Sequence, residues 1–396
     1  MLQIRPPFGL CFAAVAASLI GLCHASGQGT PDIVWATNAH SASVSSVNFS
    51  ENGNELASGS QDATANAFYV PNGNLVRSVD SGAERVLSVA LSPDGSLLAF
   101  GTDEGKSSVW RLADGVRLWR GGPDNEFAFS VSFSSDGSLL GIGRSDGINL
   151  RSAASGGGYP FGEPEGGVFG VTFSPDGTLL ASANAAGTAN LWRVPLGTPL
   201  LEFTGHSYFA PEEFEDDTVI NPVYSVDFSP DGTLVASAGA DNTVRLWRVS
   251  DGTEVRVINS TNCRVAKFSA DGKLIFTVNG GPINVWRVAT GQLVCSYTNA
   301  NAGPLDVASN GKYFAYGRDD GAVVLAYTPL VLEIFPEGHR IILRWTGGSG
   351  RYQVQRRNHP AKGKWHNVGH PTTAMSYTNK MSRHPVFYRV QSLPNR

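Results

Sequence analysis

The chain has 396 residues, more than one compact domain usually needs, so we expect at least two folding units. Only 16% of the residues are charged, while 46 are glycine, 22 proline and 3 methionine. This composition argues against long amphipathic helices and against a charge-rich disordered chain, and it favours short strands joined by tight turns. The formal net charge of -4 excludes a globally basic nucleic-acid-binding protein.

The first 25 residues indicate a secretory signal peptide. Arg5 precedes an apolar run from Phe8 to Leu22, and small residues at Cys23 and Ala25 suit cleavage after Ala25. The run is short for a membrane span, and no later stretch is apolar enough to cross a bilayer. We therefore expect export to the periplasm, the cell surface or the medium. An uncleaved anchor and a lipoprotein acylated at Cys23 are the alternatives.

A turn phrase of the type Ser-Pro-Asp-Gly returns seven times along the chain. Its glycines lie 42, 42, 40, 55, 40 and 39 residues apart, which defines seven repeats with one insertion. The seven turn glycines are Gly53, Gly95, Gly137, Gly177, Gly232, Gly272 and Gly311.

Each repeat is predicted to contain four strands. Apolar residues stand four and six positions before the turn glycine and three positions after it, as Val131, Phe133 and Leu140 do around Gly137. The Asp-Gly pair between these blocks suits a hairpin turn with positive φ at both central positions. A third strand ends in Trp-Arg in four repeats, and a fourth strand follows a further glycine. Four strands in about forty residues is the pattern of a β-propeller blade.

These features resemble the WD40 family over residues 31–328. The tryptophan that ends the third strand and the aspartate of the preceding turn match the family pattern, although arginine follows the tryptophan where the family has aspartate. Arg151 and Phe68 replace the tryptophan in two repeats. We interpret the matching residues as structural, because polar groups buried at repeated positions need hydrogen-bond partners. They are Asp62, Asp103, Asp146, Asp241, Asp319, Trp110, Trp192, Trp247 and Trp286.

The ends of the repeat region suggest how the ring closes. The seventh repeat stops after its third strand, Ala322 to Tyr327, while a spare strand stands at Asp32 to Ala36. The resemblance implies that this N-terminal strand completes the last blade, which removes the open edges. We therefore expect an all-β fold, with residues 26–328 forming a seven-bladed WD40-like propeller closed by the N-terminal strand.

The composition changes after Pro329. Residues 330–396 contain eleven Lys or Arg and two acids, a balance of +9, whereas residues 26–328 contain 18 Lys or Arg and 32 acids, a balance of -14. Four strands are predicted in the tail, at 341–345, 352–356, 365–368 and 387–390, in an order that resembles a short fibronectin type III β-sandwich without its final strand. The basic tail either docks on the acidic propeller, which we favour, or binds an anionic partner.

No catalytic or cofactor signature is found, and we expect neither a cofactor nor a metal. Gly141-Ile142-Gly143 lacks the third glycine of a dinucleotide-binding loop, and no phosphate loop or EF-hand is present. On a strand, His366 and His370 would lie about 13 Å apart, too far for one metal. Cys263 and Cys295 fall on the predicted first and fourth strands of one sheet, about 14 Å apart, so we expect two buried thiols and no disulfide.

The insertion after Gly205 is the one local irregularity. Its aromatic and acidic residues could anchor a partner or hold a cation weakly, and a solvated surface loop is the alternative. In WD40 propellers this connection opens onto the face that usually binds partners, as the resemblance implies. The candidate partner-binding residues are Tyr208, Phe209, Glu212, Phe214 and Asp216.

We interpret the chain as an exported, monomeric, non-enzymatic scaffold that binds a protein or polysaccharide partner at the loop face of the propeller. This step rests on fold analogy. The alternative is a propeller enzyme, a lyase or hydrolase acting in the central channel, although Glu84, Arg85 and Glu126 near the inner-strand mouths form no recognisable acid/base set. A third possibility is a surface-layer or adhesion component.

Overall fold

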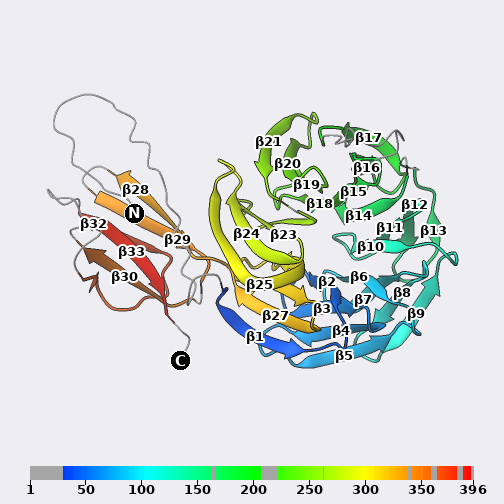
Figure 1. Cartoon of the computed structure of the whole chain (residues 1–396), viewed down its shortest axis with the longest axis horizontal. Helices are drawn as coiled ribbons and strands as arrows, with labels where there is room; N and C mark the ends of the chain where they lie inside the picture. The colour runs from blue at the N-terminus through cyan, green and yellow to red at the C-terminus, as the bar shows by residue number, and fades with distance from the viewer. Residues whose placement is uncertain are drawn as a thin grey trace, which may run out of the picture. The chain divides into compact units, whose positions relative to one another are not determined.

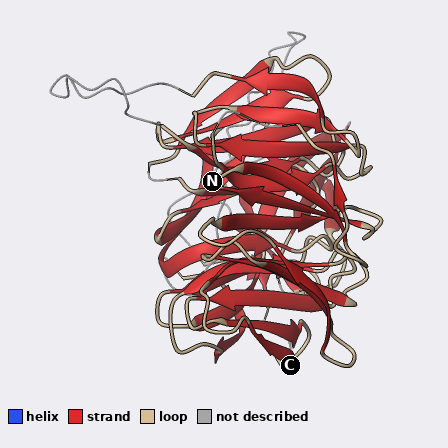
Figure 2. Ribbon diagram, turned by 90° about the vertical axis from the view of Figure 1, so that its right-hand side faces the viewer, coloured by secondary structure: helices blue, strands red, loops and turns tan. Residues whose placement is uncertain are grey.

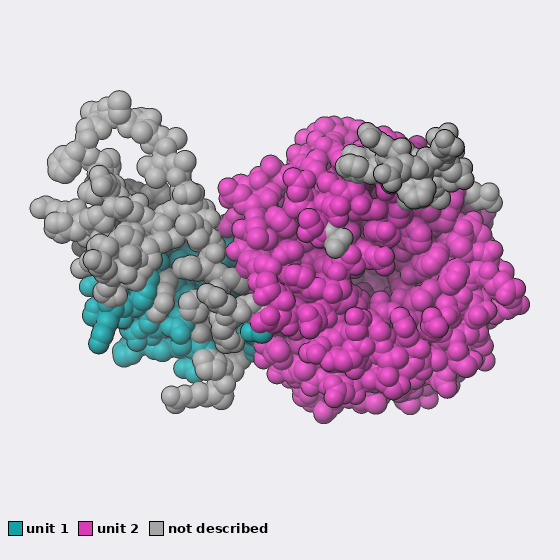
Figure 3. Space-filling view, viewed as in Figure 1, with its two compact units in different colours: residues 1–32, 327–396 teal, residues 33–326 magenta. Residues whose placement is uncertain are grey.

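The computed structural model describes residues 30–162, 164, 166–206, 221–261, 263–337, 340–348, 350–357, 364–380 and 387–393. They divide into a larger compact unit, Ile33–Ala326, and a smaller unit formed by the other described residues (Figure 3). All regular elements in these ranges are strands (Figure 2). No helix long and apolar enough to cross a membrane occurs among the described residues.

Five four-stranded antiparallel sheets follow one another in the larger unit, each with its strands in chain order. The first sheet consists of β2 (Val44–Phe49), β3 (Glu55–Ser60), β4 (Thr64–Tyr69) and β5 (Leu75–Asp80). The second consists of β6 (Val86–Leu91), β7 (Leu97–Thr102), β8 (Ser107–Arg111) and β9 (Val116–Gly121). The third consists of β10 (Ala128–Phe133), β11 (Leu139–Arg144), β12 (Gly147–Ser152) and β13 (Gly158–Tyr159). The fourth consists of β14 (Val168–Phe173), β15 (Leu179–Asn184), β16 (Ala189–Arg193) and β17 (Thr198–Phe203). The fifth consists of β18 (Val223–Phe228), β19 (Leu234–Gly239), β20 (Thr243–Arg248) and β21 (Glu254–Asn259). The predicted four strands per repeat are therefore confirmed for these five repeats.

The last two repeats form one seven-stranded sheet, where we expected two separate sheets. Its order is β22 (Val265–Phe268), β23 (Leu274–Val278), β24 (Gly281–Arg287), β25 (Leu293–Val307), β26 (Tyr313–Arg318), β27 (Ala322–Tyr327) and β1 (Ile33–Asn38). The first half of β25 pairs with β24 and the second half with β26, because the short link between Tyr297 and Ala302 keeps the chain extended. β1 pairs antiparallel with β27, so the first described strand adds to the sheet of the last repeat.

Figure 1 shows the sheets of the larger unit arranged around a common centre, with the first strand of each repeat nearest to it. Neighbouring sheets share apolar cores, and this includes the first and the last repeat. There, buried Val47 and Phe49 of β2 belong to one cluster with Ala315 of β26 and Leu325 of β27. Because a fully buried Val, Leu or Phe side chain contributes about 1.5–3 kcal/mol, these shared cores hold the sheets to one another.

The recurrent turn differs in detail from the predicted hairpin. In this turn of the third repeat Gly137 has a positive φ, 71°, and Asp136 does not. The loop between the strands is longer than two residues, and the Asp136 carboxylate accepts hydrogen bonds from Ser134 Oγ at 2.6 Å and Ser138 N at 2.9 Å. These bonds fix the aspartate without left-handed backbone. A Cβ on Gly137 would lie 3.4 Å from Cδ of Pro93, so the phrase also packs one turn on the next.

The smaller unit contains two three-stranded antiparallel sheets. One has the order β28 (Val331–Glu337), β29 (Arg340–Thr346), β32 (Ser376–Lys380), and the other β31 (His366–Asn367), β30 (Tyr352–Arg357), β33 (Phe387–Ser392). Buried residues of both sheets, among them Trp345 and Val354, form one core. The sequence predicted four of these strands and missed β28 and β32.

The two cysteines of the larger unit, Cys263 and Cys295, are buried thiols that form no disulfide, as predicted. Burial raises the pKa of the Cys263 thiol to about 12, so this thiol stays protonated at neutral pH.

Candidate functional site

A central channel runs between the innermost strands of the larger unit. Its cavity has a volume of about 610 Å³ and is lined by residues of β2, β6, β10, β14, β18, β22 and β25. Figure 3 shows the corresponding hollow in the middle of this unit. A cavity of this size lies within the range typical of ligand sites, so we describe its lining layer by layer.

Five of the innermost strands carry a β-bulge at the same position. In β10 the pairing register shifts between Ala128 and Ser130, and the same shift occurs in β2, β6, β14 and β18. A bulge leaves one extra residue outside the ladder and re-aims its side chain. The five extra residues, all of which line the channel, are Ser45, Leu87, Phe129, Phe169 and Tyr224.

Three of these bulge residues are aromatic and lie side by side. The ring centroids of Phe129 and Phe169 are 4.9 Å apart, and those of Phe169 and Tyr224 are 6.1 Å apart. The Arg264 guanidinium lies over the Tyr224 ring at 5.0 Å. We call Phe129, Phe169, Tyr224 and Arg264 the collar. Its three rings are only partly buried, so they present apolar surface to an incoming group.

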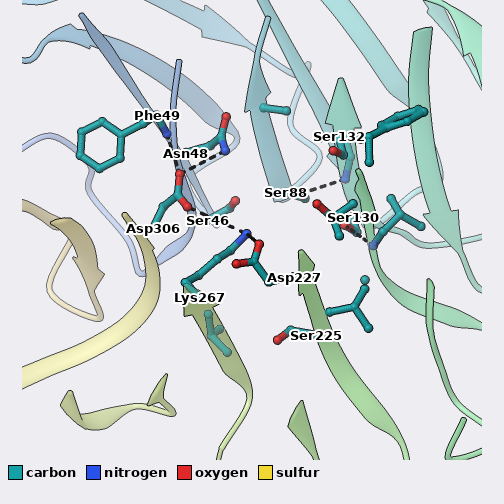
Figure 4. Close-up of a pocket in the computed structure, with 18 of the residues that line it drawn as sticks. Ser46, Asn48, Phe49, Ser88, Ser130, Ser132, Ser225, Asp227, Lys267 and Asp306 are labelled. Carbon is teal, nitrogen blue, oxygen red and sulfur yellow. Dashed lines mark hydrogen bonds and ion pairs between the residues drawn. The ribbon is translucent and has the colours of Figure 1, made fainter. Parts of the chain in front are cut away.

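Next along the strands comes a layer of serine hydroxyls. Each serine oxygen accepts the backbone N–H of the following repeat at 3.0–3.1 Å, as Ser88 does from Val131 and Ser130 does from Val171. Among the described residues none of these hydroxyl hydrogens has an acceptor, so they remain available to the channel. Figure 4 shows Ser88 and Ser130 across the cavity from its charged residues. The four serines are Ser46, Ser88, Ser130 and Ser225.

A charged cluster lies one layer further along (Figure 4). Lys267 Nζ is 3.1 Å from Asp227 Oδ1 and 3.9 Å from Asp306 Oδ1. Asp227 Oδ2 accepts the N–H of Phe268 at 2.9 Å, and Asp306 Oδ2 accepts the N–H of Phe49 at 2.8 Å. This last bond joins the seventh repeat to the first.

Burial acts on the pKa values of two groups of this cluster, Lys267 and Asp306. Burial by itself would lower the pKa of Lys267, but the charges of Asp227 and Asp306 outweigh it and raise that pKa, so the ammonium stays charged. Burial raises the pKa of Asp306 above its ordinary range, and the charge of Lys267 offsets only part of this rise.

The turn aspartates that the sequence singled out lie away from the channel lining. Asp241 Oδ1 is 3.0 Å from His206 Nδ1, while His206 Nε2 contacts Ser237 Oγ at 2.7 Å and Trp247 Nε1 donates to the same oxygen at 2.8 Å. These hydrogen bonds join His206, which precedes β18, to Ser237 of β19 and Trp247 of β20, and His206 also contacts Asp241 of the turn between these two strands.

The other repeats keep only parts of this arrangement. In the first repeat His40 contacts Asp62 at 3.2 Å and Ser58 at 2.7 Å, but Phe68 at the tryptophan position has no N–H to donate. Trp192 and Trp286 donate to Ser182 and Thr277 at 3.0 and 2.9 Å.

In the second repeat Trp110 Nε1 has no partner, because Phe100 occupies the serine position. Three turn aspartates accept other donors: Asp103 from Arg85 N, Asp146 from Arg144 Nε and Asp319 from Ser43 Oγ.

Other predicted residues do not gather into a site. Tyr208, Phe209, Glu212, Phe214 and Asp216 lie outside the described residues. Glu84 pairs with Arg120, Glu126 bonds Ser145 and Arg85 faces Asp103, and none of the three residues lines the channel. His366 and His370 are exposed.

The collar was missed by the sequence interpretation, although a signal for it exists. Apolar residues stand four and six positions before each turn glycine. The next buried apolar residue stands nine positions before it, as Val168 does in the fourth repeat. This change from even to odd spacing marks the bulge, and the bulge turns the side chain of the residue eight positions before the glycine toward the channel.

Comparison with known proteins is consistent with this architecture. Four segments, 32–67, 73–111, 159–193 and 215–248, match the family model "WD domain, G-beta repeat", so the chain contains WD40 repeats. It is 26% identical over 194 residues to transcription initiation factor TFIID subunit 5 of Caenorhabditis elegans, which is 40% of this chain and 30% of that protein.

Two further relatives show the same limited coverage. Eukaryotic translation initiation factor 3 subunit I of Aspergillus terreus is 27% identical over 39% of this chain and 47% of its own length. Human apoptotic protease-activating factor 1 is 30% identical over 32% of this chain and 10% of its own length. The chain thus spans less than half the length of each of these relatives.

Proposed function

We propose that this protein is an exported, non-enzymatic scaffold whose larger unit is a closed seven-bladed WD40-type propeller that binds a partner protein at the collar. WD40-repeat proteins generally act as protein-interaction scaffolds, which supports the class of function. The observation that carries the proposal is the collar itself, because three of five successive bulges bring partly exposed aromatic residues to one channel. Aromatic residues and arginine are the types most enriched where binding energy concentrates.

Two finer features belong to the same proposal. Export is supported by the apolar run that follows Arg5, which lies outside the described residues. The smaller unit is inferred to be a fibronectin type III-like sandwich, and the support is its pair of antiparallel sheets around one shared core.

A propeller enzyme remains the second candidate, because the charged cluster in the channel contains two carboxylates and a lysine. The geometry favours the scaffold. Both carboxylates already accept backbone N–H groups, and both face the same ammonium group, so neither is placed as a free general acid or base.

The test uses the chain from residue 26 to 396 as bait in an extracytoplasmic extract at low and high salt. We expect a protein that is retained in high salt by the unaltered bait and lost by a Phe129→Ala, Phe169→Ala double variant. A Tyr69→Ala variant is the matched control, since Tyr69 is an exposed aromatic residue outside the channel. Equal capture by the double variant, folded by circular dichroism, would contradict the proposal.

A further inference from the structure

Arg264 takes the place of an aromatic residue in the collar. It stands eight positions before the turn glycine of the sixth repeat, as Phe129, Phe169 and Tyr224 do in the three repeats before it. Its guanidinium lies over the Tyr224 ring at 5.0 Å, and all four residues line the cavity. A ring provides no oxygen acceptor, so this contact leaves the N–H groups of the guanidinium in need of one.

The rest of the described chain does not supply that acceptor. Arg264 is exposed, and it forms no ion pair and no side-chain hydrogen bond with any described residue. Lys267, the other cation of the lining, differs in this respect, because Asp227 and Asp306 lie 3.1 and 3.9 Å from its Nζ. Arg264 is therefore the cation of the lining that is available to an anionic ligand.

The layer next to the collar adds a hydrogen-bond donor close to Arg264. Ser225 follows Tyr224 directly on β18, and its Oγ accepts the N–H of Ala266 at 3.0 Å. This bond places the Ser225 hydroxyl beside β22, which Arg264 precedes, while the hydroxyl hydrogen has no acceptor among the described residues. A guanidinium and a hydroxyl that both lack acceptors favour a ligand with strong acceptors, such as carboxylate or phosphate oxygens.

The charge around the channel favours an anion with a single charge. Residues 26–328 carry 18 Lys or Arg and 32 acids, and Asp227 and Asp306 lie deeper in the same channel. This field opposes every anion, but it opposes a doubly charged phosphate more than a singly charged carboxylate. A carboxylate also matches the planar guanidinium with two parallel hydrogen bonds. A carboxylate is therefore the favoured ligand group.

The rings beside Arg264 select the residue that carries this carboxylate. The Tyr224 ring lies 5.0 Å from the guanidinium, less than the length of two extended residues at about 3.3–3.6 Å each. The last residue of a chain reaches both, because its free carboxylate and its side chain share one Cα. An internal acidic residue would need a second, apolar residue beside it.

The packing of the rings also determines where an apolar side chain lies. Phe129, Phe169 and Tyr224 contact one another, with ring centroids 4.9 and 6.1 Å apart, so a side chain packs on their exposed surface and not between them. A chain end can reach this surface from the cavity mouth without the chain having to leave the cavity again.

We propose that the collar binds the C-terminus of the partner protein, with the terminal carboxylate on Arg264 and Ser225 and a large apolar last side chain on the exposed surface of Phe169 and Tyr224. This inference rests on the proposed function and specifies which part of the partner is bound.

The test titrates short peptides into the chain from residue 26 to 396 and measures binding by isothermal titration calorimetry. The probe is acetyl-Gly-Gly-Phe with a free terminal carboxylate, and its C-terminal amide is the matched control. We expect saturable binding of the acid and binding of the amide that is about tenfold weaker or absent, because charge-assisted hydrogen bonds are about twice as strong as neutral ones. The acid acetyl-Gly-Gly-Gly, which lacks the ring, should bind about fivefold more weakly or not at all.

Two further probes distinguish the source of the anion. Acetyl-Phe-Glu amide carries a ring and an internal carboxylate but no free terminus, and phenyl phosphate carries a ring and a doubly charged group. We expect both to bind more weakly than the acid acetyl-Gly-Gly-Phe.

Two variants locate the site. Arg264→Gln removes the charge from an exposed side chain and should weaken binding of the acid about tenfold. Phe169→Ala removes one ring and should weaken it about fivefold. Arg193→Gln is the control, since Arg193 is an exposed arginine outside the channel lining, and it should leave binding unchanged.

No saturable binding of any probe, equal binding of the acid and its amide, tighter binding of either further probe, or unchanged binding by Arg264→Gln would overturn the inference. Such a result is distinguishable from failure of the scaffold proposal, because collar-dependent capture of a protein would then persist without a requirement for a free C-terminus.

Discussion

The fifth repeat shows what a turn aspartate does at the scale of single residues. Asp241 and His206 both have side chains that are 1% exposed, and they face each other at 3.0 Å. Asp319 lies in the corresponding turn of the seventh repeat, one position before the equivalent of Asp241, and it is an exposed acceptor of one serine hydroxyl. The two residues therefore allow a buried turn aspartate to be compared with an exposed one.

We expect Asp241→Ala to lower the free energy of unfolding by about 3 kcal/mol, because it leaves a buried histidine without its partner. Asp319→Ala should cost less than about 1 kcal/mol, as exposed interactions do. Urea unfolding followed by circular dichroism measures both values. Equal losses for the two variants would contradict the structural role of Asp241.

The buried His40 makes the stability of the folded chain depend on pH. Burial lowers the pKa of His40 below 6.5, and the charge of Asp62 offsets only part of this effect. As the pH falls through 6.5, the unfolded chain binds a proton at this residue before the folded chain does. The free energy of unfolding therefore decreases from pH 7 to pH 5.

A His40→Asn variant isolates this contribution, since asparagine does not titrate. The stability of the variant should depend less on pH between 7 and 5 than that of the unaltered chain. The turn aspartates Asp94, Asp136, Asp176 and Asp231 do not interfere, because hydrogen bonds from serine hydroxyls hold their pKa values below 3.8. If the free energies of unfolding of the variant and the unaltered chain changed equally with pH over this range, the contribution of His40 would be refuted.

At the scale of elements, the recurrent turn places glycine where the backbone requires it. Gly137 has a φ of 71°, and a Cβ there would lie 3.4 Å from Pro93 of the preceding repeat. Gly158 in β13 has no positive φ, and a Cβ there would meet nothing within 4 Å.

Replacing each glycine by alanine separates these cases. Gly137→Ala should lower the free energy of unfolding by about 1–2 kcal/mol, the cost of a left-handed L-residue. Gly158→Ala should be neutral or slightly stabilising, because alanine restricts the unfolded chain. Thermal unfolding of the two variants provides the comparison, and a smaller loss for Gly137→Ala than for Gly158→Ala would refute it.

The elements also show how far the sequence alone could lead. Periodicity of two and the turn phrase predicted the four strands of the first five repeats, because these signals are local. The fusion of the last two repeats through β25 was not predicted, since pairing on both sides of one extended strand is a tertiary choice. The collar was missed because strict alternation was assumed, whereas the bulge between Val168 and Gly170 breaks it.

At the scale of the whole molecule, the larger unit depends on contacts between its first and last strands. Trp35 of β1 donates from Nε1 to Val70 O at 2.8 Å, and β1 pairs with β27 from the opposite end of the repeat region. Partly buried Trp35 also packs on the core shared by the first and last repeats.

Trp35→Ala is therefore expected to lower the free energy of unfolding by about 2–3 kcal/mol, somewhat less than a fully buried tryptophan would. Hydrogen exchange should accelerate in Ala322–Tyr327, the strand that pairs with β1. Faster exchange in β2 alone, with β27 unchanged, would indicate that β1 does not stabilise the sheet of the last repeats.

The central claim is that a partner protein binds at the collar, and site-specific photocrosslinking tests it most directly. Benzoylphenylalanine replaces Phe169 in one sample of the chain and Tyr69 in another, and both are exposed to the same extracytoplasmic extract. The account predicts a crosslinked protein from position 169 that is absent from position 69. Crosslinks of equal intensity from both positions, or from position 69 alone, would place the partner elsewhere and contradict it.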